Sequence, residues 1–197
     1  MRNEAIVLTP LLKDWISRTL PLLDLDRVHF RRGLPWFIRE KSWVSGITLP
    51  HPFRASETVI YLKYWPADEA FERPWAELET ELSLLGHECF HALQRQEAPS
   101  LMPTWTHPEA FLSAYFADWT LFGYRQHPLE LTAYAYDADL REWLQDQDAQ
   151  PDWRQLPVRE ESAFRMESGN ARLLFGMMLA NAARFARAFA LFLTGRY

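Results

Sequence analysis

The stretch His87-Glu88-Cys89-Phe90-His91 has the pattern H-E-x-x-H. Two His residues four positions apart lie one above the other on one face of a helix, so both imidazoles can reach a single metal ion. The Glu beside the first His can accept a proton from a water molecule that the metal activates. The alternative is that His87 and His91 are ordinary helix residues. The spacing and the intervening Glu88 favour a metal site.

The residues around this motif predict the helix that it requires. Pro74 suits a first helical turn, and acidic residues, which are favoured near a helix N-terminus, follow at Glu77, Glu79 and Glu81. Between residues 75 and 96, Gly86 is the one Gly and there is no Pro. Apolar side chains recur there at helical spacing, at Leu78, Leu82, Leu85, Cys89 and Leu93. Cys89 lies on this stripe, so we expect a small buried side chain rather than a reactive thiol.

A catalytic zinc ion usually has three protein ligands and one water. The downstream residues that can supply the third ligand are His107, Glu109, Asp118, His127, Glu130, Asp137 and Asp139. We choose Glu130, because Pro128 opens a helix there and the helix dipole favours a carboxylate in the first turn. The nearby Ala133 is small, which suits two helices that cross at a metal. His127 is the main rival ligand.

Two residues near Glu130 are candidates for catalytic roles. If His127 is not a ligand, it can hydrogen-bond a zinc-bound carboxylate or an oxyanion. The alternative is a solvent-exposed His in the N-cap region of the helix. Tyr134 lies four residues after Glu130 on the same face and can donate a hydrogen bond to a developing oxyanion. The alternative for Tyr134, as for Tyr124, is a tyrosine of the hydrophobic core.

The H-E-x-x-H helix followed by E-x-x-A-Y-x-Y at residues 130–136 resembles the short gluzincin-type metallopeptidases of bacteria. It is also similar to several zincin-like bacterial domains of unknown function. In those families the two His and the later Glu bind zinc, and the Glu of the first motif is the base. The resemblance covers roughly residues 30 to 145. It implies that His87, His91 and Glu130 bind Zn²⁺, with Glu88 as the catalytic base.

The chain also departs from the better-known zinc peptidases. No N-E-x-x-S-D motif follows, as it does in the larger thermolysin-like enzymes. Metzincins have a third His six residues after the second, and position 97 is Glu97 here. These departures leave the substrate class open.

The region before the motif predicts a helix and then a small sheet. Thr9-Pro10 is a helix start, and apolar residues continue at helical spacing up to Pro21. Gly and Pro separate short strands expected at residues 28–30, 36–38, 45–49 and 58–62. The expected fold class is α+β: a zincin-like minimal metallopeptidase fold with a small, mainly antiparallel N-terminal sheet packed on the H-E-x-x-H helix, followed by further helices.

In zincin-like proteins the edge strand of such a sheet pairs with an extended peptide substrate through main-chain hydrogen bonds. The resemblance points to the strand near Val59–Lys63 for this role. The alternative is that this strand lies in the interior of the sheet.

Further helices are expected over residues 108–121 and from Pro128 to about Gln145. Residues 147–157 are polar and contain two Pro, which indicates a loop. We therefore expect a zincin-like metal-binding domain over residues 1–150 and a C-terminal helical extension, residues 151–197, packed on the same domain.

Residues 171–194 form a long apolar segment that is expected to be helical. Asn181, Arg184 and Arg187 lie in its middle, and each Arg at a bilayer centre costs roughly 2.5 kcal/mol or more. We therefore expect no stable membrane span. The helix is expected to pack on the core or to bind a partner, for which a homodimer is one arrangement. A helix lying in a lipid interface is a further alternative.

The composition excludes some classes of function. Hydrophobic residues make up 48% of the 197 residues, which is enough for one domain with a sizeable core. The net charge of −5 argues against general nucleic-acid binding. The N-terminal apolar run is too short for a signal peptide, so a cytoplasmic bacterial enzyme is the expectation.

The sequence therefore predicts a zinc-dependent hydrolase, and a metallopeptidase acting on a peptide or protein substrate in particular. The competing hypothesis is a non-catalytic zincin-fold binding or structural module that docks through its C-terminal helix. An intact motif indicates competence for the chemistry and leaves open whether it is used.

Overall fold

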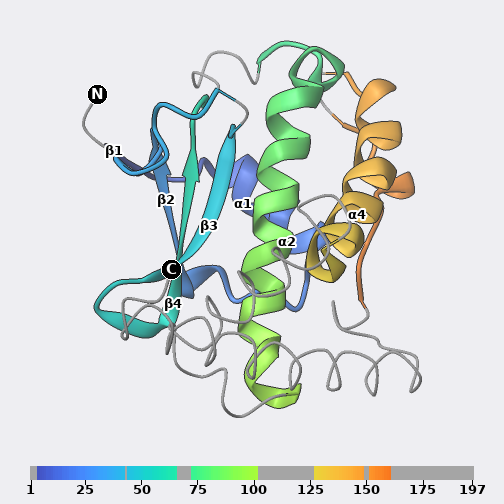
Figure 1. Cartoon of the computed structure of the whole chain (residues 1–197). Helices are drawn as coiled ribbons and strands as arrows, with labels where there is room; N and C mark the ends of the chain where they lie inside the picture. Colours follow the sequence, from blue (N-terminus) through green and yellow to red (C-terminus); the bar gives the residue numbers. More distant parts are fainter. Residues whose placement is uncertain (1–3, 43, 66–71, 102–126, 149–150, 161–197) are drawn as a thin grey trace, which may run out of the picture.

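The computed structural model describes residues 4–42, 44–65, 72–101, 127–148 and 151–160, which form an α+β fold. Its strands are β1 (Glu4–Ile6), β2 (Val28–Arg32), β3 (Gly46–His51) and β4 (Arg54–Leu62). Its α-helices are α1 (Pro10–Thr19), α2 (Glu79–Leu101) and α4 (Pro128–Gln145). Short 3₁₀ turns lie at η1 (Leu25–Arg27), η3 (Trp75–Leu78) and η6 (Trp153–Gln155). In Figure 1, α2 lies between the sheet and α4.

The sheet is mixed, with the strand order β1-β2-β4-β3. The pairings β1–β2 and β3–β4 are antiparallel, whereas β2 and β4 are parallel. Along β2, Val28 and Phe30 are buried while His29 and Arg31 are partly exposed. Because successive side chains of a strand point to opposite faces, one face of the sheet packs on the helices and the other faces outward. The expected α+β class is thus confirmed, with a mixed sheet in which two of the three strand pairings are antiparallel.

The expected strand at residues 36–38 is wrong. Residues 36–40 form turns, in which the Ile38 amide donates to the Pro35 carbonyl and the Lys41 amide to the Ile38 carbonyl. Trp36 is 82% exposed. The apolar run suggested a strand, but these local hydrogen bonds use the backbone groups that a sheet would need.

The proposed edge strand near Val59–Lys63 is also wrong, because β4 is an interior strand. It pairs with β2 on one side and β3 on the other. Among the described strands, β3 and β1 are the edges. The near-continuous burial of Val59, Ile60 and Leu62 fits the interior position. The three-residue strand β1 was not anticipated.

The helices begin largely where their capping residues predict. The Thr9 hydroxyl accepts a hydrogen bond from the Leu12 amide at the start of α1. The predicted helix from residue 75 begins as the 3₁₀ turn η3 and continues as α2. Pro128 occupies the first turn of α4, as expected.

The core lies where α1, α2, α4 and the inner face of the sheet meet. Trp153, at the start of the expected C-terminal extension, contacts the rings of Trp75 and Trp143 at centroid distances of 5.8 and 6.1 Å. The expected helices at 108–121 and 171–194 lie outside the described residues. Within the described part of the chain, no helix combines the length and apolar character needed to cross a membrane.

Candidate metal centre

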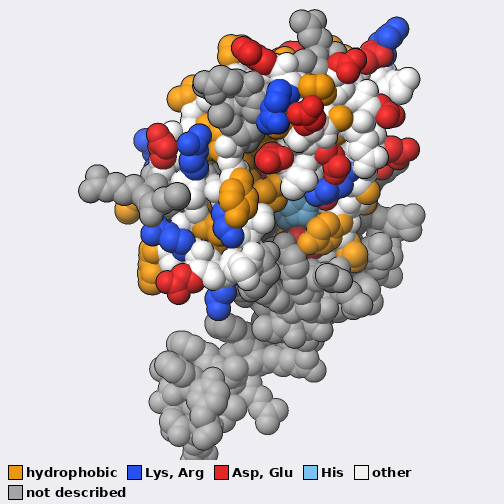
Figure 2. All heavy atoms as spheres, turned by 90° about the horizontal axis from the view of Figure 1, so that it is seen from above, with side chains coloured by type: hydrophobic (Ala, Val, Ile, Leu, Met, Phe, Trp, Pro, Cys, Tyr) orange, Lys and Arg blue, Asp and Glu red, His pale blue; other side chains and the backbone are white. Residues whose placement is uncertain are grey.

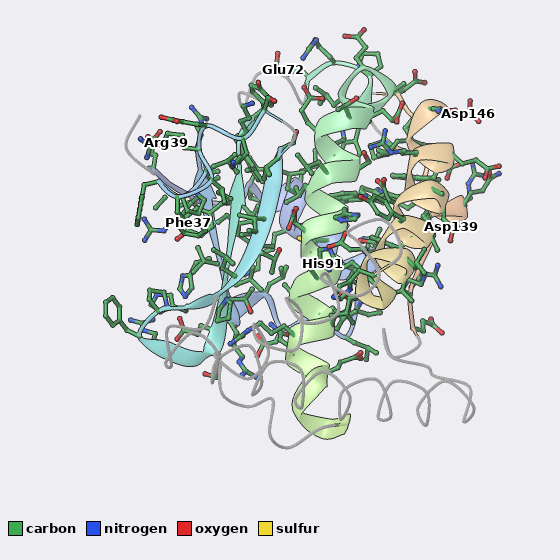
Figure 3. All side chains as sticks on the ribbon, viewed as in Figure 1. Phe37, Arg39, Glu72, His91, Asp139 and Asp146 are labelled. Carbon is green, nitrogen blue, oxygen red and sulfur yellow. The ribbon has the colours of Figure 1, made fainter. Side chains whose placement is uncertain are left out.

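Helix α2 brings the two His residues of the motif together, as predicted. His87 and His91 lie one turn apart, with their Nε2 atoms 3.1 Å from each other. Figure 3 shows His91 midway along α2. The two side chains are only 7% and 13% exposed. Both rings therefore present a nitrogen to the same small volume.

Helix α4 supplies the carboxylate. Glu130 lies in its first turn, and its side chain is 2% exposed. Its Oε2 lies 3.5 Å from His87 Nε2, and its Oε1 lies 3.4 Å from His91 Nε2. His87, His91 and Glu130, here called the inner cluster, are thus brought together as the sequence predicted.

The spacing of these donor atoms suits a zinc ion. Two ligands at about 2.0–2.1 Å from a tetrahedral zinc lie about 3.3 Å apart. The corresponding distances in the inner cluster are 3.1, 3.4 and 3.5 Å. Two imidazoles and one carboxylate are also a donor set that catalytic zinc sites use, with the fourth position left for water. The residues therefore fit the ion.

Gly86 allows α4 to approach α2 closely beside the inner cluster. A Cβ atom at this position would lie 2.4 Å from Leu140 Cδ2 and 3.5 Å from Tyr136 Cε1. Ala133, expected to be small for this reason, is fully buried. Gly86 thus leaves room for Leu140 of α4, the helix that carries Glu130.

Gln94 fixes the orientation of His91. Its side-chain nitrogen donates to the Leu129 carbonyl and the Thr132 hydroxyl, at 3.0 and 2.8 Å. Since a carbonyl can only accept, the Gln94 oxygen must face His91 Nδ1, 2.8 Å away. Nδ1 therefore carries a hydrogen, and in the neutral ring the lone pair of Nε2 points at the metal position. Gln94 also ties α2 to the first turn of α4.

The carboxylate of Glu88 is buried against the edge strand β3. The Thr48 hydroxyl lies 2.7 Å from Glu88 Oε2 and 2.9 Å from the Glu88 carbonyl. A Cβ atom at Gly46 would lie 2.6 Å from Glu88 Oε1. Gly46 therefore leaves the space that the carboxylate occupies, while Thr48 orients it.

Burial and neighbouring charges shift the pKa values of Glu88, His91 and Cys89. Burial raises the pKa of Glu88, while the charges of His91 and His87 and the Thr48 hydroxyl act in the opposite direction. Burial acts to lower the pKa of His91, but the hydrogen bond and charge of Glu130 outweigh it and raise the pKa to about 9. In the metal-free protein a proton therefore stabilises the pair of His91 and Glu130. Burial also raises the pKa of Cys89, which is fully buried as expected.

Tyr134 lies beside the inner cluster. Its ring centroid is 5.1 Å from that of His87, and the residue is 38% exposed. It is therefore not a core tyrosine, and its role as an oxyanion donor stays a prediction. Figure 2 shows histidine surface among hydrophobic side chains on the face viewed. Tyr124 lies outside the described residues.

His127 is the N-cap of α4, and its Nδ1 accepts a hydrogen bond from the Leu129 amide at 3.1 Å. The alternative of an exposed N-cap residue is correct for the N-cap position and wrong for the exposure, because the side chain is fully buried. His127 is not among the three residues of the inner cluster. Its catalytic role stays a prediction. The alternative ligands His107, Glu109 and Asp118 lie outside the described residues.

Sequence reasoning missed Thr48, Gly46 and Gln94. Gln94 carried a weak signal, because it lies three residues after His91 on a helix. Thr48 and Gly46 are some forty residues from Glu88 in the chain, so only the pairing of the sheet with α2 reveals them.

Comparisons of the chain with protein-family models, with curated proteins and with solved structures find no significant match. The resemblance to zincin-like metallopeptidases therefore stays a hypothesis that depends on the motif and on the geometry of the site.

Proposed function

We propose that this protein is a zinc-dependent hydrolase, and specifically a metallopeptidase. The observation that carries the proposal is the convergence of His87, His91 and Glu130 at distances of 3.1 to 3.5 Å, with the Glu88 carboxylate buried beside them. A zinc ion bound there would lower the pKa of a water ligand towards about 7 and polarise a substrate carbonyl.

The protein groups have distinct roles in this proposal. Glu88 accepts the proton of the attacking water and delivers it to the leaving amine. In the metal-free protein, burial raises the pKa of Glu88 and so favours proton uptake by this carboxyl. Thr48 orients the carboxylate, and Tyr134 donates a hydrogen bond to the oxyanion that develops on the substrate.

The position of β3 in the sheet favours a peptide as the substrate. Within the described part of the chain β3 is an edge strand, and it carries Thr48 and Gly46, which contact Glu88. An extended peptide that pairs with β3 would pass beside the catalytic carboxylate. The peptide-pairing role predicted for residues 59–63 therefore passes to β3, residues 46–51.

The test compares three variants of the whole chain. Glu88→Gln should keep zinc and lose about 10²- to 10⁴-fold in peptide cleavage, because the base is gone and the ligands remain. His87→Ala should lose the zinc ion of the inner cluster and, with it, cleavage. Glu81→Gln, the same isosteric change two turns earlier in α2, is the matched control and should change neither.

Zinc is measured by elemental analysis, and cleavage with a peptide library in the presence and absence of a chelator. Wild-type activity in Glu88→Gln would show that Glu88 is not the base. Bound zinc without any cleavage by the wild type would favour the non-catalytic module.

A further inference from the structure

A second group of two His and one Glu lies on the outward face of the sheet. His29 on β2, His51 on β3 and Glu57 on β4 offer ligand atoms that all lie within 4.8 Å of one another. These three residues are here called the outer cluster. They come from three different strands and are not part of any motif in the sequence.

Strand register explains why they meet. His29 is paired with Val59 in the parallel β2–β4 ladder, and Glu57 lies two residues before Val59 on the same side of β4. The neighbours Val28 and Phe30 face the helices, so His29 faces outward. His51 ends β3 at a register shift between Pro50 and His51. Leu49 is paired with Val59, so alternation along β3 places His51, two residues after Leu49, on the same face as His29 and Glu57.

The contacts within the outer cluster are close. His29 Nε2 hydrogen-bonds Glu57 Oε2, and the rings of His29 and His51 lie 5.2 Å apart. The side chains of His29 and Glu57 are 37% and 20% exposed. The donor atoms are therefore held by the sheet yet can be reached from solvent.

The present partners of these side chains can be exchanged at small cost. Arg54 Nη1 lies 3.1 Å from Glu57 Oε2, but the Arg54 side chain is 60% exposed and can move into water. The Phe53 amide donates to His51 Nδ1 at 3.2 Å. This amide belongs to an exposed turn and can bond to water instead.

We propose that His29, His51 and Glu57 bind a second divalent transition-metal ion of the zinc, nickel or copper type. Imidazole nitrogens with one carboxylate suit these ions, whereas calcium and magnesium prefer oxygen ligands. The ion joins the β3–β4 hairpin to β2 on the face opposite to α2, so its role is structural. The inference is independent of the proposed peptidase activity.

The experiment uses the untagged whole chain after removal of metal, with Zn²⁺ as the probe. Calorimetric titration and elemental analysis should give two ions for the wild type. His87→Ala should bind one ion, His51→Ala should bind one, and the double variant should bind none. Because Arg54 competes for Glu57, the outer cluster should have a Kd at least about tenfold above that of the inner cluster.

Stability gives a second measurement. Zinc should raise the unfolding temperature of His87→Ala and leave that of His87→Ala/His51→Ala unchanged. If His51→Ala does not fold, Glu57→Gln and His29→Gln replace it, since both remove a ligand while keeping a polar side chain.

Two results would overturn the proposal. One is a His87→Ala protein that binds no zinc. The other is a second ion that persists in His51→Ala and in Glu57→Gln, because that ion would be held elsewhere. Since the measurements are ion counts and unfolding temperatures, they do not depend on whether the inner cluster supports cleavage.

Discussion

The inner and outer clusters contain the same residue types but differ in how they are held. The inner cluster lies between two helices, and its three side chains are 2% to 13% exposed. In the outer cluster, on a sheet surface, the side chains of His29 and Glu57 are 37% and 20% exposed. Chemistry on a bound ion needs rigid ligands and control over water. The comparison therefore favours the proposed division, with catalysis at the inner cluster and a structural role for the outer one.

Burial of the inner cluster makes its charged groups costly in the metal-free protein, more so than those of the partly exposed outer cluster. Without a metal, Glu130 is a buried carboxylate, which is costly unless a positive charge or hydrogen bonds stabilise it. The raised pKa of His91, about 9, reflects this demand. Folding of the metal-free protein should therefore depend on pH.

The largest expected effect is on the stability of the chelated protein. The folded pKa of His91 lies above its unfolded value of 6.5, so its contribution is fully present below pH 6.5 and is lost as pH rises through about 9. A shift of this size corresponds to about 3 kcal/mol. Burial also raises the pKa of Glu88 above 4.5. Its contribution to the stability of the folded protein is therefore likewise lost as the pH rises above 4.5. Urea denaturation between pH 6 and pH 9.5 in a chelator measures the loss.

Two controls sharpen this prediction. His91→Gln in the same chelator should lose less stability over the same range, because the titrating imidazole is absent. The zinc-loaded wild type should behave in the opposite way and gain stability with rising pH, since metal ligands must be deprotonated. Parallel curves for chelated wild type and His91→Gln would mean that the proton is not shared between His91 and Glu130.

The next effect concerns Gln94, the side chain that orients His91. Gln94→Met keeps the volume but removes the hydrogen bond to His91 Nδ1 and the bonds to α4. Loss of such a supporting contact typically weakens metal binding about 10- to 100-fold. Competition with a chromophoric chelator measures the inner Kd.

Gln96→Met is the matched control for Gln94→Met. Gln96 lies on the same helix and also bonds to backbone, but its partner is Asp24, at 2.9 Å in both directions. Gln96→Met should leave the zinc Kd of the inner cluster unchanged. Both variants should leave the zinc Kd of the outer cluster unchanged. An equal loss of affinity in the two variants would indicate a general destabilisation of α2.

The sequence predicts the parts of the site that are local. H-E-x-x-H places His87, Glu88 and His91 within two turns of one helix, and Pro128 places Glu130 in the first turn of another. Both predictions depend on short-range spacing and capping, which the chain encodes directly.

The predictions that failed concern contacts between segments that are far apart in the sequence. Strand order determined that β3 rather than β4 is the edge, and the parallel β2–β4 pairing cannot be read from either strand alone. The role of Gly86, which leaves room for Leu140 of α4, also depends on a contact with a distant segment. The outer cluster likewise exists only because three strands are in register.

The smallest expected effect tests β3, the strand that contacts Glu88 and carries His51 of the outer cluster. Thr48 directs one hydroxyl hydrogen towards two acceptors of Glu88, so its loss should cost roughly 1 kcal/mol, or about fivefold in kcat/KM. Thr48→Val should show this loss with unchanged zinc content, and Thr48→Ser should restore activity. Because the Thr48 hydrogen bond lowers the pKa of Glu88, the acid limb of the kcat/KM profile should move to higher pH in Thr48→Val. A fivefold loss without this movement would mean that Thr48 supports the strand and does not act through Glu88.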